Sequence, residues 1–287
     1  MAADRPTIEV GVNLEYVRHA DQSREYGFRR AAEMGFAYVE PCLIQGHCTL
    51  SEAGYCHWAS MDSVDPRDMR AKLEEVGVEP SAVSAHAQLM RPWAAEHLIK
   101  AIRYAAVLGA PLVNTAEGQK PEWMSEDEAL TIIGVNLRAA LREAEKEGIR
   151  IGLEPHGLFT TNAEGIRSIL ELGGSPALGV NFDTGNAFMS GADPLPLLEE
   201  VVEHVIHLHA KDIGGELLDK RGEVMGTPVG VACGDGEVDW HGVLSILQDN
   251  GYSGVLSVEC GSEEQAERSL AYLRPLTESE ATAGAGR

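Results

Sequence analysis

The sequence predicts an α/β fold, a single-domain (β/α)8 barrel of the TIM type. Eight short apolar segments alternate with helix-like segments along the 287 residues, an ordinary length for a barrel of roughly 250 residues. The apolar segments are hydrophobic on both faces, which is typical of a parallel sheet covered by helices. A doubly wound open sheet is the runner-up. However, the chain has no G-x-G-x-x-G turn after an early strand, where such sheets normally bind a phosphate.

In the first half of the chain, apolar runs are followed by helices that stop at glycine. Glycine is common just past a helix end, because it adopts the left-handed conformation without strain. A long insertion rich in Gly, His and Cys separates the second strand from its helix, and loops of this length are usually functional. The expected strands span residues 8–13, 37–41, 79–86 and 111–118, and the expected helices span residues 21–34, 66–76, 94–108 and 125–147.

The second half continues the alternation and contains another long, glycine-rich loop over residues 211–238. The expected strands span residues 150–154, 177–183, 205–210 and 254–259, and the expected helices span residues 163–172, 194–202, 240–250 and 263–273. We therefore expect a barrel domain over residues 1–275 and a flexible C-terminal tail over residues 276–287.

Composition and charge argue against several classes of partner. The chain carries 45 acidic and 23 basic residues, a formal net charge of −22. Binding to nucleic acid depends on Lys and Arg contacts to phosphates, so no nucleic-acid partner is expected. No apolar run is long enough to cross a membrane. Five cysteines without C-x-x-C spacing, and no signal-like N-terminus, indicate a reducing, cytoplasmic location.

Four consecutive apolar runs close on a group that can bind a metal ion. These groups are Glu154, Asp183, His209 and Glu259. In a TIM barrel all strand C-termini open onto one face, so the four side chains should converge there. Three carboxylates and one imidazole suit Mn²⁺ best, or Mg²⁺, while Zn²⁺, Co²⁺ and Fe²⁺ stay possible. A single such residue is more often a helix cap, but four buried in succession would be costly without a cation.

His156 lies two residues after Glu154, just beyond the strand end, so it should project over the same pocket. A histidine there can act as general base or acid near neutral pH. The alternative is a hydrogen-bonding partner that orients Glu154.

Further residues near the strand ends are candidate contacts to a small-molecule substrate. For Lys211 the alternative is an ion pair with Asp212 or Glu259, and Trp58 offers a stacking wall for a ring. His207 alternates with His209, and we assign His209 as the ligand because it is nearer the strand end. The candidate substrate contacts are His86, Glu117, Lys211, His47, Trp58 and Asn186.

The four metal-site segments read G-L-E-P-H-G, N-F-D-T-G-N, H-L-H-A-K-D and S-V-E-C-G. They resemble the xylose isomerase-like TIM barrels of the sugar phosphate isomerase/epimerase superfamily, over almost the whole chain. Within it, the chain is most similar to the α subunits of bacterial C-glycoside deglycosidases. The E-P-H arrangement and the segments GTPVGVACGDG, EYVRHADQS and EPCLIQGHCTLSEAGYCHWAS carry that similarity.

The resemblance implies a metal-dependent carbon-carbon lyase with His156 as a catalytic residue. It also implies a small β subunit in a hetero-oligomer and a 3-oxo-glycoside that a separate oxidoreductase makes. The implied reaction removes the C2 proton and expels the aglycone from C1 by β-elimination.

Two other functions remain open. In ketose 3-epimerases of the superfamily the two metal-binding glutamates, here Glu154 and Glu259, exchange protons with the substrate. Those enzymes usually carry a histidine where this chain has Asn186, which argues against plain epimerisation. Aldose-ketose isomerisation, which passes through a metal-bound enediolate, belongs with this alternative. The remaining one is a metal-stabilised barrel without catalysis, which binds sugar or anchors a subunit.

Overall fold

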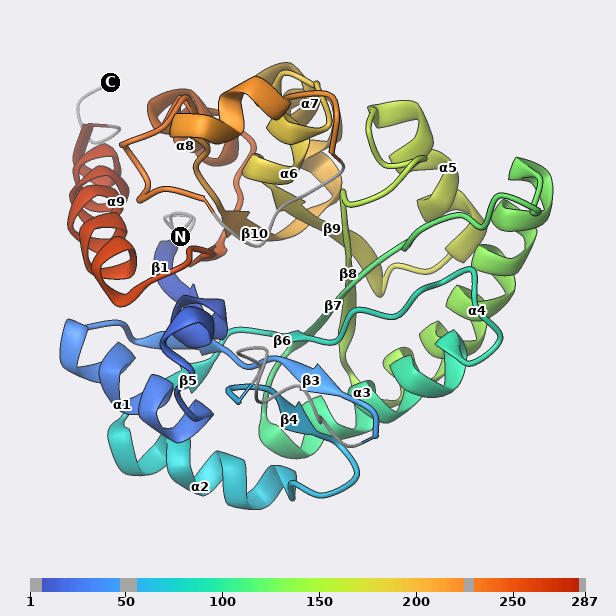
Figure 1. Cartoon of the computed structure of the whole chain (residues 1–287), viewed down its shortest axis with the longest axis horizontal. Coiled ribbons are helices and arrows are strands. Elements are labelled where there is room, and N and C mark those ends of the chain that lie inside the picture. Colours follow the sequence, from blue (N-terminus) through green and yellow to red (C-terminus); the bar gives the residue numbers. More distant parts are fainter. Residues whose placement is uncertain (1–6, 47–55, 225–229, 284–287) are drawn as a thin grey trace, which may run out of the picture.

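The computed structural model describes residues 7–46, 56–224 and 230–283, which form a parallel barrel surrounded by helices (Figure 1). The sheet order is β5-β2-β1-β11-β10-β9-β8-β7-β6. Its strands are β1 (Ile8–Asn13), β2 (Tyr38–Glu40), β5 (Glu79–Pro80), β6 (Val83–Ser84), β7 (Leu112–Ala116), β8 (Arg150–Glu154), β9 (Leu178–Asp183), β10 (Val205–Ala210) and β11 (Gly254–Val258). The fold is thus the predicted single-domain α/β barrel.

The third predicted strand is divided into β5 and β6, and the barrel closes at this point. The backbone N–H of Ser84 donates to the carbonyl of Pro41 at 2.9 Å, and Cys42 forms a parallel bridge with Ser84. The predicted insertion after β2 contributes a separate pair of short parallel strands, β3 (Leu43–Ile44) and β4 (Ala59–Ser60).

Helices follow the strands as the sequence predicts, with shifted ends. The main helices are α1 (Arg24–Met34), α2 (Pro66–Val76), α3 (Ala94–Leu108), α4 (Glu126–Glu147), α5 (Ala163–Gly173), α7 (Pro194–Val201), α8 (Trp240–Asp249) and α9 (Glu263–Ala283). Ser125 and Glu128 form a capping box at the start of α4, and Gly148 ends that helix with a φ of 70°. Among the described helices, none is both long and apolar enough to cross a bilayer.

The differences from prediction are local. The first helix does not begin at Asp21, because a 3-10 helix η1 (Leu14–Ala20) precedes it and Asp21 adopts a left-handed conformation with a φ of 51°. A short helix α6 (Thr184–Met189) directly follows β9, and η3 (Val202–His204) and η4 (Gly215–Lys220) add two further 3-10 turns. Helix α9 continues through Pro275 to Ala283, beyond its expected end at Leu273. The flexibility of the tail stays a prediction.

Alternation along the strands decides which side chains enter the barrel. Phe182 and Leu208 belong to the apolar core, whereas Asn181 and His207 stand at the neighbouring positions. Successive residues of a strand point to opposite faces, so the polar residues recur at every second position toward the strand end. A Cβ atom on Gly152 would lie 2.3 Å from the Asn114 side-chain oxygen and 3.0 Å from the Asn181 Cβ. The side chains of these two asparagines therefore fill the space beside Gly152.

Candidate active site

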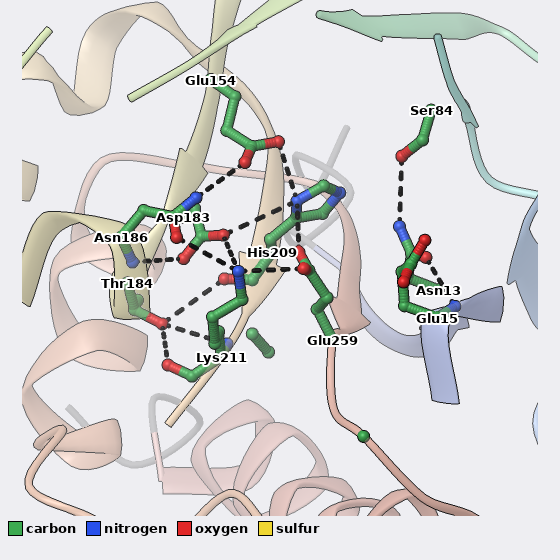
Figure 2. Close-up of polar contacts among 12 residues, drawn as sticks. Asn13, Glu15, Ser84, Glu154, Asp183, Thr184, Asn186, His209, Lys211 and Glu259 are labelled. Carbon is green, nitrogen blue, oxygen red and sulfur yellow. Dashed lines mark hydrogen bonds and ion pairs between the residues drawn. The ribbon is translucent and has the colours of Figure 1, made fainter. Parts of the chain in front are cut away.

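The four predicted metal ligands meet at the C-terminal end of the barrel. Glu154 and Asp183 end β8 and β9, His209 lies near the end of β10, and Glu259 directly follows β11. All four are buried, and one donor atom from each lies within 4.8 Å of the others. The His209 Nδ1 atom is 3.1 Å from a carboxylate oxygen of Glu154 and 3.1 Å from one of Glu259 (Figure 2). The register of the parallel strands, with His209 paired to Asp183, produces this convergence.

The chemistry of this donor set fits a divalent cation. Burial raises the pKa of the Asp183 carboxyl, and the negative charges of Glu259 and Glu154 raise it further, against the charge of Lys211. The Lys211 ammonium lies 3.0 Å from Asp183 Oδ2 and 2.9 Å from Glu259 Oε1. Two of the carboxylates therefore already attract a cationic group. Three carboxylates and one imidazole are suitable for Mn²⁺ or Mg²⁺ and do not distinguish them from Zn²⁺.

Asp183 also fulfils the alternative role of a helix cap. Its Oδ1 atom accepts a hydrogen bond of 2.7 Å from the backbone N–H of Asn186, at the start of α6. Its Oδ2 atom is buried and accepts no hydrogen bond within the described residues, although Lys211 lies nearby. Capping therefore uses one oxygen and leaves the second one facing the cluster.

Two asparagines orient Glu154. The Asn186 side-chain amide donates to Glu154 Oε1 at 2.8 Å, and the Asn181 amide donates to Oε2 at 3.1 Å. Asn186 also accepts a hydrogen bond of 3.1 Å from the Lys211 ammonium. Asn186 was predicted as a substrate contact, and its amide here binds two residues of the protein while it also lines the cavity.

Glu40, at the end of β2, is a member of the site that the sequence analysis missed. Its carboxylate has no exposed surface and lies 3.0 Å from the Nε2 atoms of both His207 and His209. Because a carboxylate only accepts, the His209 Nε2–H donates to Glu40 and the Nδ1 atom is directed to the metal-site carboxylates. Strand β2 ends on a carboxylate, as β8 and β9 do, and that was the available signal.

A cavity of about 330 Å³ lies over the cluster. Most of the predicted catalytic and substrate-contact residues line it, as do Gln88, Asn13 and Arg18. His47 lies outside the described residues. The predicted residues that line the cavity are His86, His156, Trp58, Asn186, Lys211, Glu154, His209 and Glu259.

The imidazoles of His156 and His86 stand together on one side of this cavity. Their ring centroids are 6.2 Å apart, and the His86 Nε2 atom is 3.6 Å from a Glu154 oxygen. Desolvation by surrounding protein lowers the pKa of His156, and the charge of Glu154 opposes this change. His156 therefore offers a neutral imidazole at neutral pH, as a proton acceptor requires.

Glu117, predicted as a substrate contact, lies beneath the loop that carries His156. Its side chain has no exposed surface and does not line the cavity. Instead, Glu117 Oε1 accepts a hydrogen bond of 2.7 Å from the backbone N–H of Phe159, in the loop that carries His156. A Cβ atom on Gly157 would lie 2.1 Å from the same oxygen, so this loop packs directly on the carboxyl group. Burial raises the pKa of Glu117 to about 7.

Lys211 forms one of its two predicted alternative ion pairs, with Glu259, and also pairs with Asp183. Asp212 has a separate role in the long loop after β10. Its carboxylate accepts hydrogen bonds from the backbone N–H of Gly234 at 2.8 Å and from Trp240 Nε1 at 2.9 Å. Asp212 therefore fixes the path of this loop.

Comparisons with known proteins agree with this architecture. The chain is 30% identical over 158 residues to an inosose dehydratase of Clostridium perfringens, which is 52% of this chain and 52% of that protein. It thus spans about half the length of such curated relatives. It is 26% identical to a 3-oxo-isoapionate decarboxylase of Pectobacterium atrosepticum, over 68% of this chain and 67% of the relative.

Solved structures support the fold. The crystal structure of a D-tagatose 3-epimerase-like protein matches with a TM-score of 0.75 and 22% identity, covering 95% of this chain and 99% of that one. A family model described as xylose isomerase-like TIM barrel matches residues 28–276. The protein therefore belongs to the xylose isomerase-like TIM barrel family, as the sequence motifs indicated.

Proposed function

We propose that the chain is the α subunit of a divalent-metal C-glycoside deglycosidase, a lyase that cleaves 3-oxo-glycosides. The observation that carries this proposal is the position of His156, which lines the same cavity as Glu154, His209 and Glu259 of the cluster. A base beside a metal site is the arrangement needed to remove a proton next to a carbonyl group.

The roles of the residues follow from this arrangement. When held by the four ligands, Mn²⁺ supplies a Lewis acid that stabilises negative charge on the 3-oxo group. His156 accepts the proton from C2. The electron pair of the C2–H bond then forms the C1–C2 double bond as the bond from C1 to the aglycone breaks. His156, now protonated, returns a proton to the departing carbon. Asn186 and Lys211 hold Glu154, Asp183 and Glu259 in place during these steps.

The names of the relatives favour a lyase. A dehydratase of an inosose and a decarboxylase of a 3-oxo acid both remove a group from a ketone-bearing compound. The proposed deglycosidase does the same with a different leaving group. A sugar-modifying activity on a small molecule is therefore the common part of the proposal.

Epimerisation or aldose-ketose isomerisation is the second candidate. It is favoured by Glu154 and Glu259, which both line the cavity and flank His209. Against it stands Asn186, which replaces the histidine common in ketose 3-epimerases and uses its amide to bind Glu154.

A small β subunit is proposed as the partner. Support comes from three exposed apolar side chains, Trp93, Trp123 and Leu158, which are 56%, 76% and 40% exposed. Each lies in the loop after one of the adjacent strands β6, β7 and β8, on the face where the site opens. A partner that packs on this sector would cover apolar surface beside the cavity mouth.

The test is an assay of the Mn²⁺-loaded protein, alone and with the β subunit, on a 3-oxo-C-glucoside. Free aglycone is followed by chromatography. We expect release that requires the metal, is lost in Glu154→Ala and falls by at least about a hundredfold in His156→Ala, as expected for loss of a general base. His204→Ala is the matched control, because His204 lies in η3, before the start of β10, whereas His209 of the site lies near the end of that strand.

Three outcomes distinguish the candidates. If no aglycone appears but solvent deuterium enters a free ketose beside its carbonyl, the protein is an epimerase or isomerase. If His156→Ala retains full release, His156 is not the base. If neither release nor exchange occurs with any subunit combination, the non-catalytic sugar-binding alternative gains support.

A further inference from the structure

The cavity has a second polar wall, formed by Glu15, Arg18 and Trp58, that the proposed metal chemistry does not use. Glu15 and Arg18 belong to η1, which directly follows β1, and Trp58 precedes β4. All three line the cavity. Figure 2 shows Asn13 and Glu15 together, on the opposite side of His209 from Asp183.

Glu15 is held by contacts from separate parts of the chain. Its Oε1 atom accepts a hydrogen bond of 2.8 Å from Trp58 Nε1 and lies 3.2 Å from His57 Nε2. Its Oε2 atom pairs with Arg18 Nη1 at 3.1 Å. The Asn13 side-chain oxygen accepts a hydrogen bond of 3.0 Å from the backbone N–H of Glu15, which fixes the start of η1. Glu15 is only 8% exposed, so the wall is preorganised by packing.

The charge state of this wall is also defined. Burial tends to raise the pKa of Glu15, but the hydrogen bond and charge of His57 and the charge of Arg18 lower it to about 2. Glu15 is therefore a carboxylate at neutral pH, next to the guanidinium of Arg18. Such a pair offers an acceptor and several donors side by side.

We propose that the Glu15–Arg18 pair is a substrate subsite that recognises neutral, adjacent hydroxyl groups and rejects sugar acids. A hydroxyl group both donates and accepts, so two neighbouring hydroxyls satisfy the carboxylate and the guanidinium together. A ligand carboxylate would be attracted by Arg18 but repelled by Glu15 at contact distance. The subsite rests on the proposed function only in taking the substrate to be a polyhydroxylated compound.

The same cluster could be considered a metal site, because Glu15, Cys42 and His57 also place donor atoms close together. The Trp58 N–H occupies one face of Glu15 Oε1, and the Arg18 guanidinium pairs with Oε2. A cation here would have to displace both of these donors, which favours an organic hydroxyl ligand. Metal stoichiometry is therefore included in the experiment.

The experiment measures binding to the Mn²⁺-loaded full chain by ligand-observed NMR, and it needs no turnover. Two matched pairs of probes are used: methyl β-D-glucoside against methyl β-D-glucuronide, and D-glucitol against D-gluconate. The wild type should prefer the neutral member. The Glu15→Gln variant keeps the side-chain shape but removes the negative charge. For at least one pair, the affinity for the neutral probe divided by the affinity for the acid should fall about tenfold, because Arg18 can then pair with the ligand carboxylate.

Two controls make the result specific. The gain in acid binding should disappear in the double variant Glu15→Gln/Arg18→Gln, and the Mn²⁺ affinity and stoichiometry of Glu15→Gln should equal those of the wild type. An unchanged ratio for both pairs, a wild type that prefers the acids, or loss of a second metal equivalent in Glu15→Gln would overturn the subsite. Failure of aglycone release with these binding results intact would count against the lyase alone.

Discussion

Replacing Glu117 with glutamine tests how the loop that carries His156 is supported. The Glu117 carboxyl is fully buried, and its pKa is raised from an ordinary 4.5 to about 7. Between these two values the folded protein keeps a proton that the unfolded chain has released. The free energy of unfolding therefore falls as the pH rises from 4.5 to about 7, and this contribution is constant above that range.

The magnitude follows from the two pKa values. Each pH unit in this interval changes the free energy of unfolding by about 1.4 kcal/mol, which amounts to about 3 kcal/mol over the whole interval. Glutamine keeps an oxygen that can accept the Phe159 N–H, but it does not titrate. Relative to Glu117→Gln, the wild type should therefore lose about 3 kcal/mol between pH 4 and pH 7.5.

Urea unfolding of both metal-free proteins across this pH range measures the difference. Groups common to both proteins cancel, and so does any pH-independent cost of burying the amide. Glu122→Gln, at an exposed position of the loop after β7, controls for the loss of one negative charge. If the unfolding free energies of wild type and Glu117→Gln run parallel with pH, the buried carboxyl does not hold its proton and the reasoning fails.

Three further predictions concern the site. Glu40→Gln should weaken Mn²⁺ binding about 10- to 100-fold in titration calorimetry, because the partner of His209 Nε2 loses its charge. An Mn²⁺ affinity equal to that of the wild type would show that Glu40 does not support metal binding. Gly157→Ala should lower the free energy of unfolding by about 1–3 kcal/mol, since its Cβ would overlap the Glu117 carboxyl; an unchanged urea midpoint would contradict that packing. Mn²⁺ at a hundred times its dissociation constant should stabilise the wild type by about 2.7 kcal/mol in thermal unfolding, but not Asp183→Asn at the same concentration.

The barrel and the convergence of four ligands could be predicted because both depend on local pattern. A strand that ends on Glu154 or Asp183 keeps its side-chain alternation up to the last residue, and parallel strands bring their ends to one face. The structure accordingly brings these residues together with His209 and Glu259. Their binding of a metal ion stays a prediction that calorimetry tests.

Side-chain positions could not be predicted where alternation no longer applies or where contacts span the chain. Strand β7 ends at Ala116, so the direction of Glu117 is set by the turn that follows and not by the pleat. The sequence analysis gave Glu15 no role of its own, although it begins the segment EYVRHADQS, and its partner Trp58 lies across the insertion after β2. Such a contact is a product of tertiary packing and leaves no periodic signal in either segment.

The contacts of the cluster also separate the two proposed chemistries. Glu259 has both oxygens engaged, one by the Lys211 ammonium at 2.9 Å and one by His209 Nδ1 at 3.1 Å. Glu154 likewise accepts from Asn186 and Asn181. An exchange of protons by these two glutamates would have to break those contacts in each turnover. The His156 imidazole lines the same cavity and accepts no hydrogen bond in the part of the chain described, so it can take a proton without disturbing the cluster. These contacts support the proposal that one histidine, and not the glutamate pair, acts as the base of the proposed elimination.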